Sequence, residues 1–230
     1  DLVVSCLNSP WLTQGPLVQD FENAIAKSVD ANYAVAVSSG TAALHLSCLA
    51  LGISNEDEVI TSSNTFVASS NSILYSKGVP KFADIDVNTG LINVDSIKRC
   101  ITSKTKAIMP VDFAGSPADM NAIYNLAKQN NLKIIQDSSH SLGATYKSTK
   151  VGCGKFSDLT VFSFHPVKPM TTGEGGAITT NDKQLYLKLC ELRTHGITKD
   201  VAKLSQNPGP WYYEMQDLGF NYRMTDIQAA

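Results

Sequence analysis

The sequence has no stretch that approaches the ~20 consecutive apolar residues of a membrane-spanning helix. Its N-terminus lacks the basic start and apolar core of a signal peptide. It also has no run of basic residues, and its formal net charge is −2 at pH 7, with a pI near 6.1. These absences argue against a membrane or a nucleic acid as partner.

Cysteine is sparse, and no two cysteines form a C-x-x-C pair that would suggest a metal site or a redox centre. The five residues are odd in number and widely spaced: Cys6, Cys48, Cys100, Cys153 and Cys190. We therefore expect reduced thiols in a cytoplasmic protein with no bound metal.

The composition is that of a globular protein, with 43% hydrophobic and 17% charged residues in a chain of 230. Short β-rich runs alternate with helical patterns, which predicts a doubly wound α/β structure with a mainly parallel sheet. Several runs are continuously apolar, as expected for strands covered on both faces. The predicted strands are Tyr33–Val37, Glu58–Ser62, Val79–Ile85, Lys106–Val111, Leu132–Asp137, Leu159–Phe164 and Gly176–Thr180.

Two helices have clear start signals. Ser116 is the expected N-cap of the first, with Pro117 at its first helical position and Asp119 in its first turn. Asp182 is the expected cap of the second, which should end near Gly196.

Ligands of such sheets bind beyond the carboxyl ends of the strands, so polar residues directly after strands are candidate site residues. The first candidate is the segment SSGT (38–41), which follows a strand and begins an Ala/Leu-rich helix. Exposed amides at the start of that helix, beside Gly40 and the hydroxyl of Thr41, suit a phosphate group. Taken alone, the segment equally fits a simple N-cap.

The second candidate is the pair Asp137 and His140, at the end of an apolar strand. A carboxylate in that poorly solvated position needs a cationic partner or several hydrogen-bond donors. An aspartate that caps the next turn and a histidine packed for structural reasons would give the same pattern.

The third candidate is Lys168, which lies between an apolar strand and the glycines of TTGEGG (171–176). Desolvation favours the neutral amine of lysine, which is a nucleophile toward carbonyls. The alternative is a lysine whose ammonium extends to solvent.

Together the three candidates supply a phosphate cradle, an acid that can pair with a heteroaromatic cation, and an amine that reacts with carbonyls. Pyridoxal phosphate requires this set of groups. The acid keeps the pyridine nitrogen protonated, and the lysine holds the cofactor as an imine.

The chain resembles the DegT/DnrJ/EryC1/StrS sugar aminotransferases over essentially all of its 230 residues. Six segments carry the resemblance: WLTQGP, AVSSGTAALHL, TFVAS, DSSHSLGATY, FSFHPVKPMTTGEGG and LGFNYRMTDIQAA. The resemblance implies a three-layer α/β structure with a mainly parallel mixed sheet, as in the large domain of fold-type I pyridoxal phosphate enzymes.

The resemblance also implies roles for individual residues. Lys168 would bind the cofactor and move the proton between the amino-acid α-carbon and the cofactor. Asp137 would pair with the pyridine nitrogen, His140 would touch the phenolic oxygen, and Phe66 would lie over the ring face. Without the resemblance, Phe66 would be taken for a core aromatic.

Three further residues match positions that hold the phosphate: Gly40, Thr41 and Ser163. Asn221 matches a residue that reaches the phosphate bound by the other subunit, which implies a homodimer. Residues 1–230 would be the large cofactor-binding domain, and the abrupt ends suggest a fragment from which the small C-terminal domain is largely absent.

The implied activity is transamination at C4 of a UDP-linked 4-keto-6-deoxy sugar, with L-glutamate as amino donor. Within the family the sequence is most similar to enzymes of pseudaminic acid biosynthesis, and Asp112, where many relatives carry histidine, fits that subgroup. Another nucleotide-linked keto sugar remains an alternative substrate.

Three other functions are alternatives to this one. A sugar dehydratase of the same family would replace Lys168 with histidine. A nicotinamide dehydrogenase would carry a G-x-G-x-x-G after its first strand, and the sequence has none. A non-catalytic regulator with the same fold is separated from an enzyme only by assay.

Overall fold

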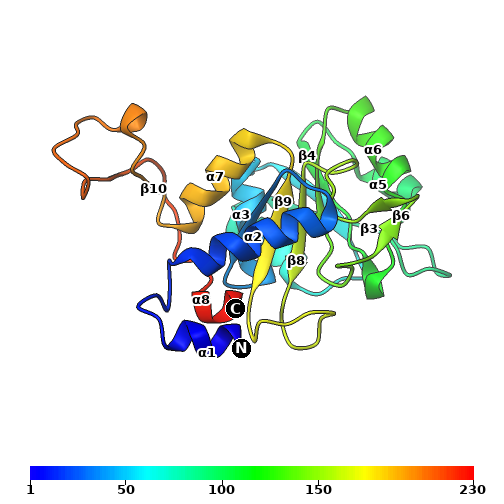
Figure 1. Ribbon diagram of the computed structural model, residues 1–230. Helices are drawn as coiled ribbons and strands as arrows, with labels where there is room; N and C mark the ends of the chain where they lie inside the picture. Colours follow the sequence, from blue (N-terminus) through cyan, green and yellow to red (C-terminus); the bar gives the residue numbers. More distant parts are fainter.

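The computed structural model describes residues 1–230 and contains a seven-stranded sheet with helices on both faces (Figure 1). The strand order is β1-β9-β8-β5-β4-β2-β3. β9 runs antiparallel to both of its neighbours, and the other four neighbouring pairs are parallel. The predicted fold class, a mainly parallel mixed sheet in an α/β structure, is therefore confirmed.

All seven predicted strands are present, several with shorter bounds. They are β1 (Tyr33–Val37), β2 (Glu58–Ser62), β3 (Val79–Ala83), β4 (Thr105–Met109), β5 (Lys133–Asp137), β8 (Leu159–Ser163) and β9 (Gly176–Thr180). Two small antiparallel pairs lie outside the sheet: β6 (Thr145–Tyr146) with β7 (Thr149–Lys150), and β10 (Ile197–Thr198) with β11 (Glu214–Met215).

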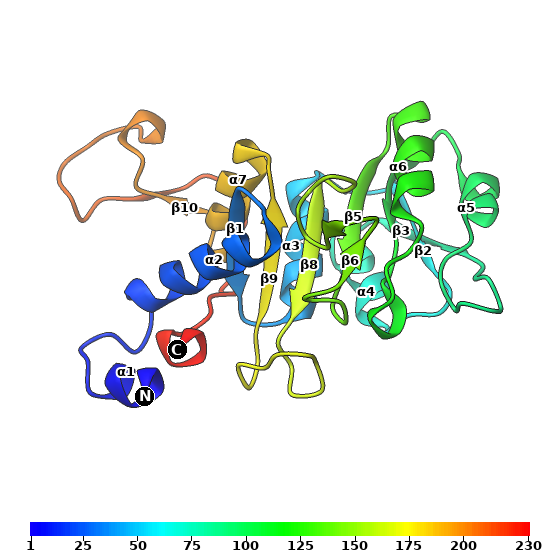
Figure 2. The ribbon, with the colours of Figure 1, turned by 45° about the vertical axis from the view of Figure 1, so that its right-hand side comes forward.

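The helices are α1 (Leu2–Leu7), α2 (Pro16–Val29), α3 (Gly40–Ala50), α4 (Ala68–Tyr75), α5 (Val94–Cys100), α6 (Met120–Gln129), α7 (Lys183–Arg193) and α8 (Asp226–Ala229). One apolar core joins α3, α4 and α7 to one face of the sheet. Two others join α2, α5 and α6 to the opposite face. Figures 1 and 2 show α2 in front of the sheet and α3 behind it.

The three-layer structure follows from strands that are apolar on both faces. In β5, Ile134 belongs to the core under α6, whereas Ile135 belongs to the core under α3. Both are almost fully buried. Burying such a side chain contributes about 1.5–3 kcal/mol, so the continuous apolar runs fix the central position of these strands.

The start of α6 differs from the prediction. Asp119, not Ser116, is the N-cap, and its carboxylate accepts a hydrogen bond from the amide of Ala122. The amide of Ala118 instead donates to the carboxylate of Asp112. That tertiary hydrogen bond holds residues 116–118 outside the helix. The second predicted cap, Asp182 of α7, is confirmed.

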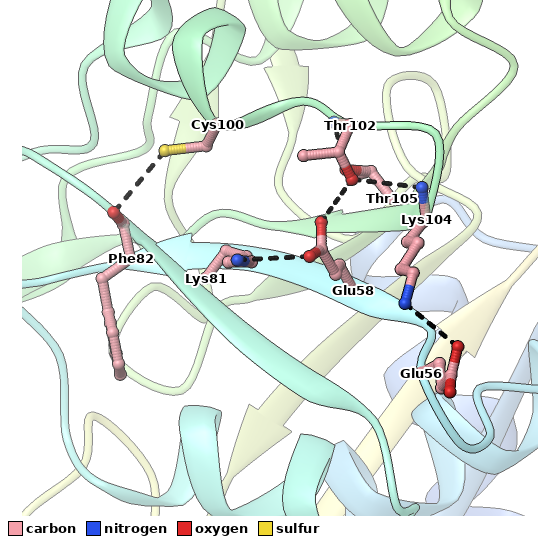
Figure 3. A network of polar contacts seen from close by, with 8 residues as sticks. All are labelled: Glu56, Glu58, Lys81, Phe82, Cys100, Thr102, Lys104 and Thr105. Atoms are coloured by element: carbon pink, nitrogen blue, oxygen red, sulfur yellow. Dashed lines mark hydrogen bonds and ion pairs between the residues drawn. The ribbon is translucent and has the colours of Figure 1, made fainter.

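A polar network joins β2, β3 and the loop before β4 at the amino end of β2 (Figure 3). Glu58 accepts a hydrogen bond from the hydroxyl of Thr102 and pairs with Lys81 at 3.2 Å. Thr102 and Lys81 therefore stabilise the negative charge of Glu58, which is buried. It lies at the opposite end of the strand from the candidate site.

The segment from β10 to Leu218 extends away from the sheet (orange in Figure 1). It carries several exposed apolar side chains, among them Trp211 and Met215. No helix of the structure is both long enough and apolar enough to cross a membrane.

Candidate active site

A cavity of about 380 Å³ lies where the parallel strands end. Parallel strands present their carboxyl ends at one edge of the sheet, and ligands of open α/β sheets bind there. The cavity is lined by seven of the eight predicted site residues: Gly40, Thr41, Phe66, Asp137, His140, Ser163 and Lys168. These residues are up to 128 positions apart in the chain (168 − 40 = 128), so the fold alone brings them together.

Gly40 begins α3 in close contact with the end of β8. A Cβ atom at position 40 would lie 2.8 Å from the Cβ of Ser163 and 3.0 Å from its hydroxyl oxygen. Glycine is required here because such contacts are sterically forbidden, not because of an unusual backbone angle. The contact places the Ser163 hydroxyl beside the first turn of α3.

The N-terminus of α3 is only partly satisfied by its own cap. The hydroxyl of Ser39 accepts a hydrogen bond from the amide of Ala42, so the simple-cap interpretation is correct for Ser39. The amides of Gly40 and Thr41 open the helix and have no acceptor within it. With the hydroxyls of Thr41 and Ser163 nearby in the cavity wall, this end of the cavity suits a phosphate group.

Asp137 ends β5 and is only 5% exposed. Its Oδ2 accepts a hydrogen bond from the hydroxyl of Ser69 at 2.7 Å. Its Oδ1 accepts from the hydroxyl of Ser139 at 2.6 Å and from the Ser139 amide at 3.2 Å. The buried carboxylate of Asp137 therefore has the several hydrogen-bond donors that we expected. Asp137 also caps the turn that follows it, because it accepts from the amide of Ser139. Asp137 forms no ion pair with any side chain of the protein.

Lys168 is half-buried in the loop after β8 and lines the cavity. Burial lowers the pKa of its amine, and the negative charge of Asp137 opposes this effect only in part. The pKa of His140 is also lowered, first by burial and then by the positive charge of Lys168, while Asp137 acts in the opposite direction. The lowered pKa of Lys168 increases the fraction of neutral, nucleophilic amine near pH 7.

Phe66 precedes α4 and is 71% exposed at the cavity wall. The alternative that it is a core aromatic is therefore wrong. An exposed aromatic ring beside a cavity gives up no core packing, and it can cover the face of a flat ligand.

Asp112 lies in the cavity wall but is fully buried. Its Oδ2 accepts hydrogen bonds from the hydroxyls of Ser138 and Ser141, each at 2.7 Å, and from the side-chain amide of Gln136 at 2.9 Å. Burial raises the pKa of Asp112, and these donors offset part of the effect. Asp112 thus anchors the turn after β5, which follows Asp137 directly and carries His140.

Asn221 is the one predicted site residue that does not line the cavity. It is exposed and forms an isolated β-bridge with Thr194, beyond the end of α7. The structure contains one copy of the chain, so the expected role of Asn221 in a partner's site stays a prediction.

The residues present fit pyridoxal phosphate. Gly40 leaves open the space that a Cβ atom would fill beside Ser163, so helix amides and hydroxyls converge on one end of the cavity. A buried carboxylate and a partly desolvated amine line the same cavity. No group of three histidine, cysteine, aspartate or glutamate side chains is placed to hold a metal ion.

Two residues that hold Asp137 were not predicted individually. Ser139 is two positions after Asp137 in the sequence, whereas Ser69 is 68 positions away on α4. Thr65, before α4, and Ser69, within α4, are four residues apart, and their hydroxyls lie 2.7 Å from each other. That spacing within TFVAS was the available signal.

The profile of the DegT/DnrJ/EryC1/StrS aminotransferase family matches residues 1–230. GDP-perosamine synthase from Escherichia coli O157:H7 is 43% identical over 231 residues, which cover 100% of this chain and 60% of that protein. The structure is similar to Helicobacter pylori PseC, an aminotransferase involved in the biosynthesis of pseudoaminic acid. The TM-score is 0.89 with 37% identity, and the match covers 99% of this chain and 59% of PseC.

A third similar protein is NtdA from Bacillus subtilis, solved with the bound cofactor PMP. Its TM-score is 0.87 with 34% identity, over 99% of this chain and 49% of NtdA. The chain spans 58–60% of the length of the curated relatives that it matches.

Proposed function

The chain belongs to the DegT/DnrJ/EryC1/StrS aminotransferase family, and on that basis we propose that it acts in pyridoxal phosphate-dependent transamination of a nucleotide-linked keto sugar. The acceptor is C4 of a UDP-linked 4-keto-6-deoxy sugar, and the amino donor is L-glutamate. Residues 1–230 form the cofactor-binding domain. The observation that carries the proposal is that Asp137, Lys168 and the start of α3 line one cavity.

Pyridoxal phosphate, when bound, supplies an electron-withdrawing ring that stabilises negative charge on the carbon next to the reacting nitrogen. Asp137 holds the ring nitrogen in its protonated form. Gly40, Thr41 and Ser163 bind the phosphate, Phe66 covers the ring face, and His140 lies near the phenolic oxygen.

Lys168 both binds the cofactor and moves the proton during the reaction. Its Nζ must accept a proton in one step and return it in the next, which is efficient when the pKa lies near the working pH. The lowered pKa of Lys168 supports this role. The presence of lysine at position 168 argues against the dehydratase alternative, in which histidine would replace it.

The choice of sugar rests on similarity. PseC, at a TM-score of 0.89, supports a place in pseudaminic acid biosynthesis. GDP-perosamine synthase, at 43% identity, supports a second candidate, a GDP-linked keto sugar. The buried Asp112 at the cavity wall is the feature of this chain that favours the first.

The functional unit is a homodimer in which Asn221 reaches the cofactor phosphate of the neighbouring subunit. Its exposed position outside the cavity of its own chain supports this arrangement. The five cysteines are all unpaired, which fits a reducing compartment such as the cytoplasm.

The direct test is to add L-glutamate to the protein loaded with pyridoxal phosphate and to follow the cofactor's absorption spectrum. We expect conversion to the pyridoxamine phosphate form, and no conversion by Lys168→Ala, which still binds the cofactor. An unchanged half-reaction in Lys168→Ala would refute the assignment of this lysine.

The acceptor is tested by giving the converted protein UDP- and GDP-linked 4-keto-6-deoxy sugars in parallel. Return of the spectrum to the pyridoxal phosphate form with the UDP sugar alone is the expected result. Return with the GDP sugar alone would support the perosamine-type reaction instead. Failure with every sugar, in a protein of the same length as its relatives, would favour the regulator alternative.

A further inference from the structure

Ser69 stands in the first turns of α4 and is fully buried against Asp137. Its hydroxyl is 2.7 Å from Oδ2 of Asp137 and 2.7 Å from the hydroxyl of Thr65. Thr65 in turn lines the cavity beside Phe66. A chain of two hydroxyls therefore connects the cavity wall to the carboxylate.

The direction of this chain follows from proton counting. A hydroxyl has one proton to donate, and a carboxylate can only accept. Ser69 therefore donates to Asp137, and Thr65 must donate to Ser69. The Thr65 hydroxyl also lies 3.3 Å from the Phe66 carbonyl, but its single proton cannot be donated to that carbonyl and to Ser69 at the same time.

The other serines of this helix behave differently. Ser70, Ser72 and Ser76 each donate to a backbone carbonyl three or four residues earlier, as serines within helices commonly do. Ser69 alone directs its hydroxyl away from the helix, to a side chain on the sheet.

The environment of Asp137 explains why this contact matters. Ser69 holds one carboxylate oxygen and Ser139 holds the other, so the plane of the carboxylate is fixed. Each oxygen can accept a further hydrogen bond. All of these donors are neutral, and Asp137 forms no ion pair with a side-chain cation, so its charge is available to a cation bound in the cavity.

We propose that Ser69, with Thr65 behind it, is a positioning residue that holds the Asp137 carboxylate toward the ring nitrogen of the cofactor. The inference rests on the proposed function, because the cation that Asp137 meets is the pyridinium of pyridoxal phosphate. Ser69 acts through Asp137 and does not touch the reacting atoms.

The test uses pyridoxamine 5′-phosphate, which binds without a covalent bond to Lys168, labelled with ¹⁵N at its ring nitrogen. Ser69→Ala should weaken its binding roughly tenfold, since it removes a buried hydrogen bond to a charged group. The ring-nitrogen NMR signal should move toward the unprotonated position. Both are measured without turnover.

Ser72→Ala is the matched control, because Ser72 is equally buried in the same helix, but its hydroxyl donates to the carbonyl of Ser69 and contacts the thiol of Cys48, not Asp137. It should leave both the affinity and the ring-nitrogen signal unchanged, whatever it does to thermal stability. Thr65→Val should shift the signal in the same direction as Ser69→Ala, and Thr65→Ser should restore it.

Equal ring-nitrogen signals in Ser69→Ala, Ser72→Ala and the unmodified protein would overturn the inference while leaving the proposed function intact. Should Ser69→Ala fail to fold, the Thr65→Val and Thr65→Ser pair decides the question by the same signal. Failure of the unmodified protein to bind the cofactor would overturn the proposed function and this inference with it.

Discussion

Gly40 and Ser163 meet where α3 begins beside the end of β8, so closely that a Cβ atom at position 40 would lie 2.8 Å from the Cβ of Ser163. This contact brings the amides of a helix N-terminus and a strand-end hydroxyl to one end of the cavity.

Gly40→Ala should destabilise the fold by about 1–3 kcal/mol, since it inserts a methyl group into a packed contact, and should weaken cofactor binding. Urea unfolding and titration with pyridoxal phosphate measure the two effects. The double variant Gly40→Ala/Ser163→Gly should recover stability, because the clashing side chain is gone. It should not recover affinity, because the hydroxyl is gone too. Recovery of both would show that Ser163 does not bind the phosphate.

Asp112→Asn should destabilise the protein by about 1–3 kcal/mol, because an amide replaces an acceptor that satisfies several buried donors. The free energy of urea unfolding at pH 7 is the measurement. Asp182→Asn provides the control: Asp182 is an exposed N-cap of α7, and asparagine caps a helix about as well as aspartate, so a change of only a few tenths of a kcal/mol is expected. Equal losses in the two variants would contradict the anchoring role of Asp112.

The reactivity of Lys168 should report its lowered pKa directly. Competitive labelling of the cofactor-free protein with trace acetic anhydride, read out by mass spectrometry across pH, should give a midpoint below the value of about 10.4 for an unperturbed lysine. Asp137→Asn should lower the midpoint further, since the charge of Asp137 raises the pKa of Lys168. A midpoint at or above the unperturbed value would contradict the desolvation of this amine.

Thr102→Val should weaken the fold in a pH-dependent way through Glu58. The hydrogen bond from Thr102, followed by Lys81, lowers the pKa of Glu58. A lowered carboxyl pKa stabilises the folded state above the unfolded value of about 4.3, and that contribution is lost as the pH falls through the folded pKa. The loss of melting temperature in Thr102→Val should therefore be larger at pH 7 than near pH 3.

The effect of Thr102→Val on function should be absent, because Glu58 lies at the amino end of β2 and neither Glu58 nor Thr102 lines the cavity. Unchanged affinity for pyridoxal phosphate is the expected result. Lys104→Ala tests a neighbouring exposed pair, Lys104 with Glu56, for which almost no loss of stability is expected. A pH-independent loss in Thr102→Val would contradict the role of Glu58.

Much of the site was predictable because its residues follow strands. The apolar runs before Asp137 and Lys168 predict β5 and β8, and parallel strands of one sheet end at one edge.

The start of α6 was not predictable in the same way. Ser116 has the right side chain for a cap, but the hydrogen bond from the Ala118 amide to Asp112 draws that segment away from the helix.

The layered fold, the edge at which ligands bind and the residue types available there can be read from the amino-acid sequence, because periodicity and strand-end position are local properties of the chain. How those residues are held depends on packing between distant segments. The hydroxyl of Ser69 reaches Asp137 across 68 positions, and Asp137 forms no ion pair with a cationic side chain. Such contacts depend on how α4 packs against the sheet, and helix packing joins residues whose separation in the chain carries no local signal.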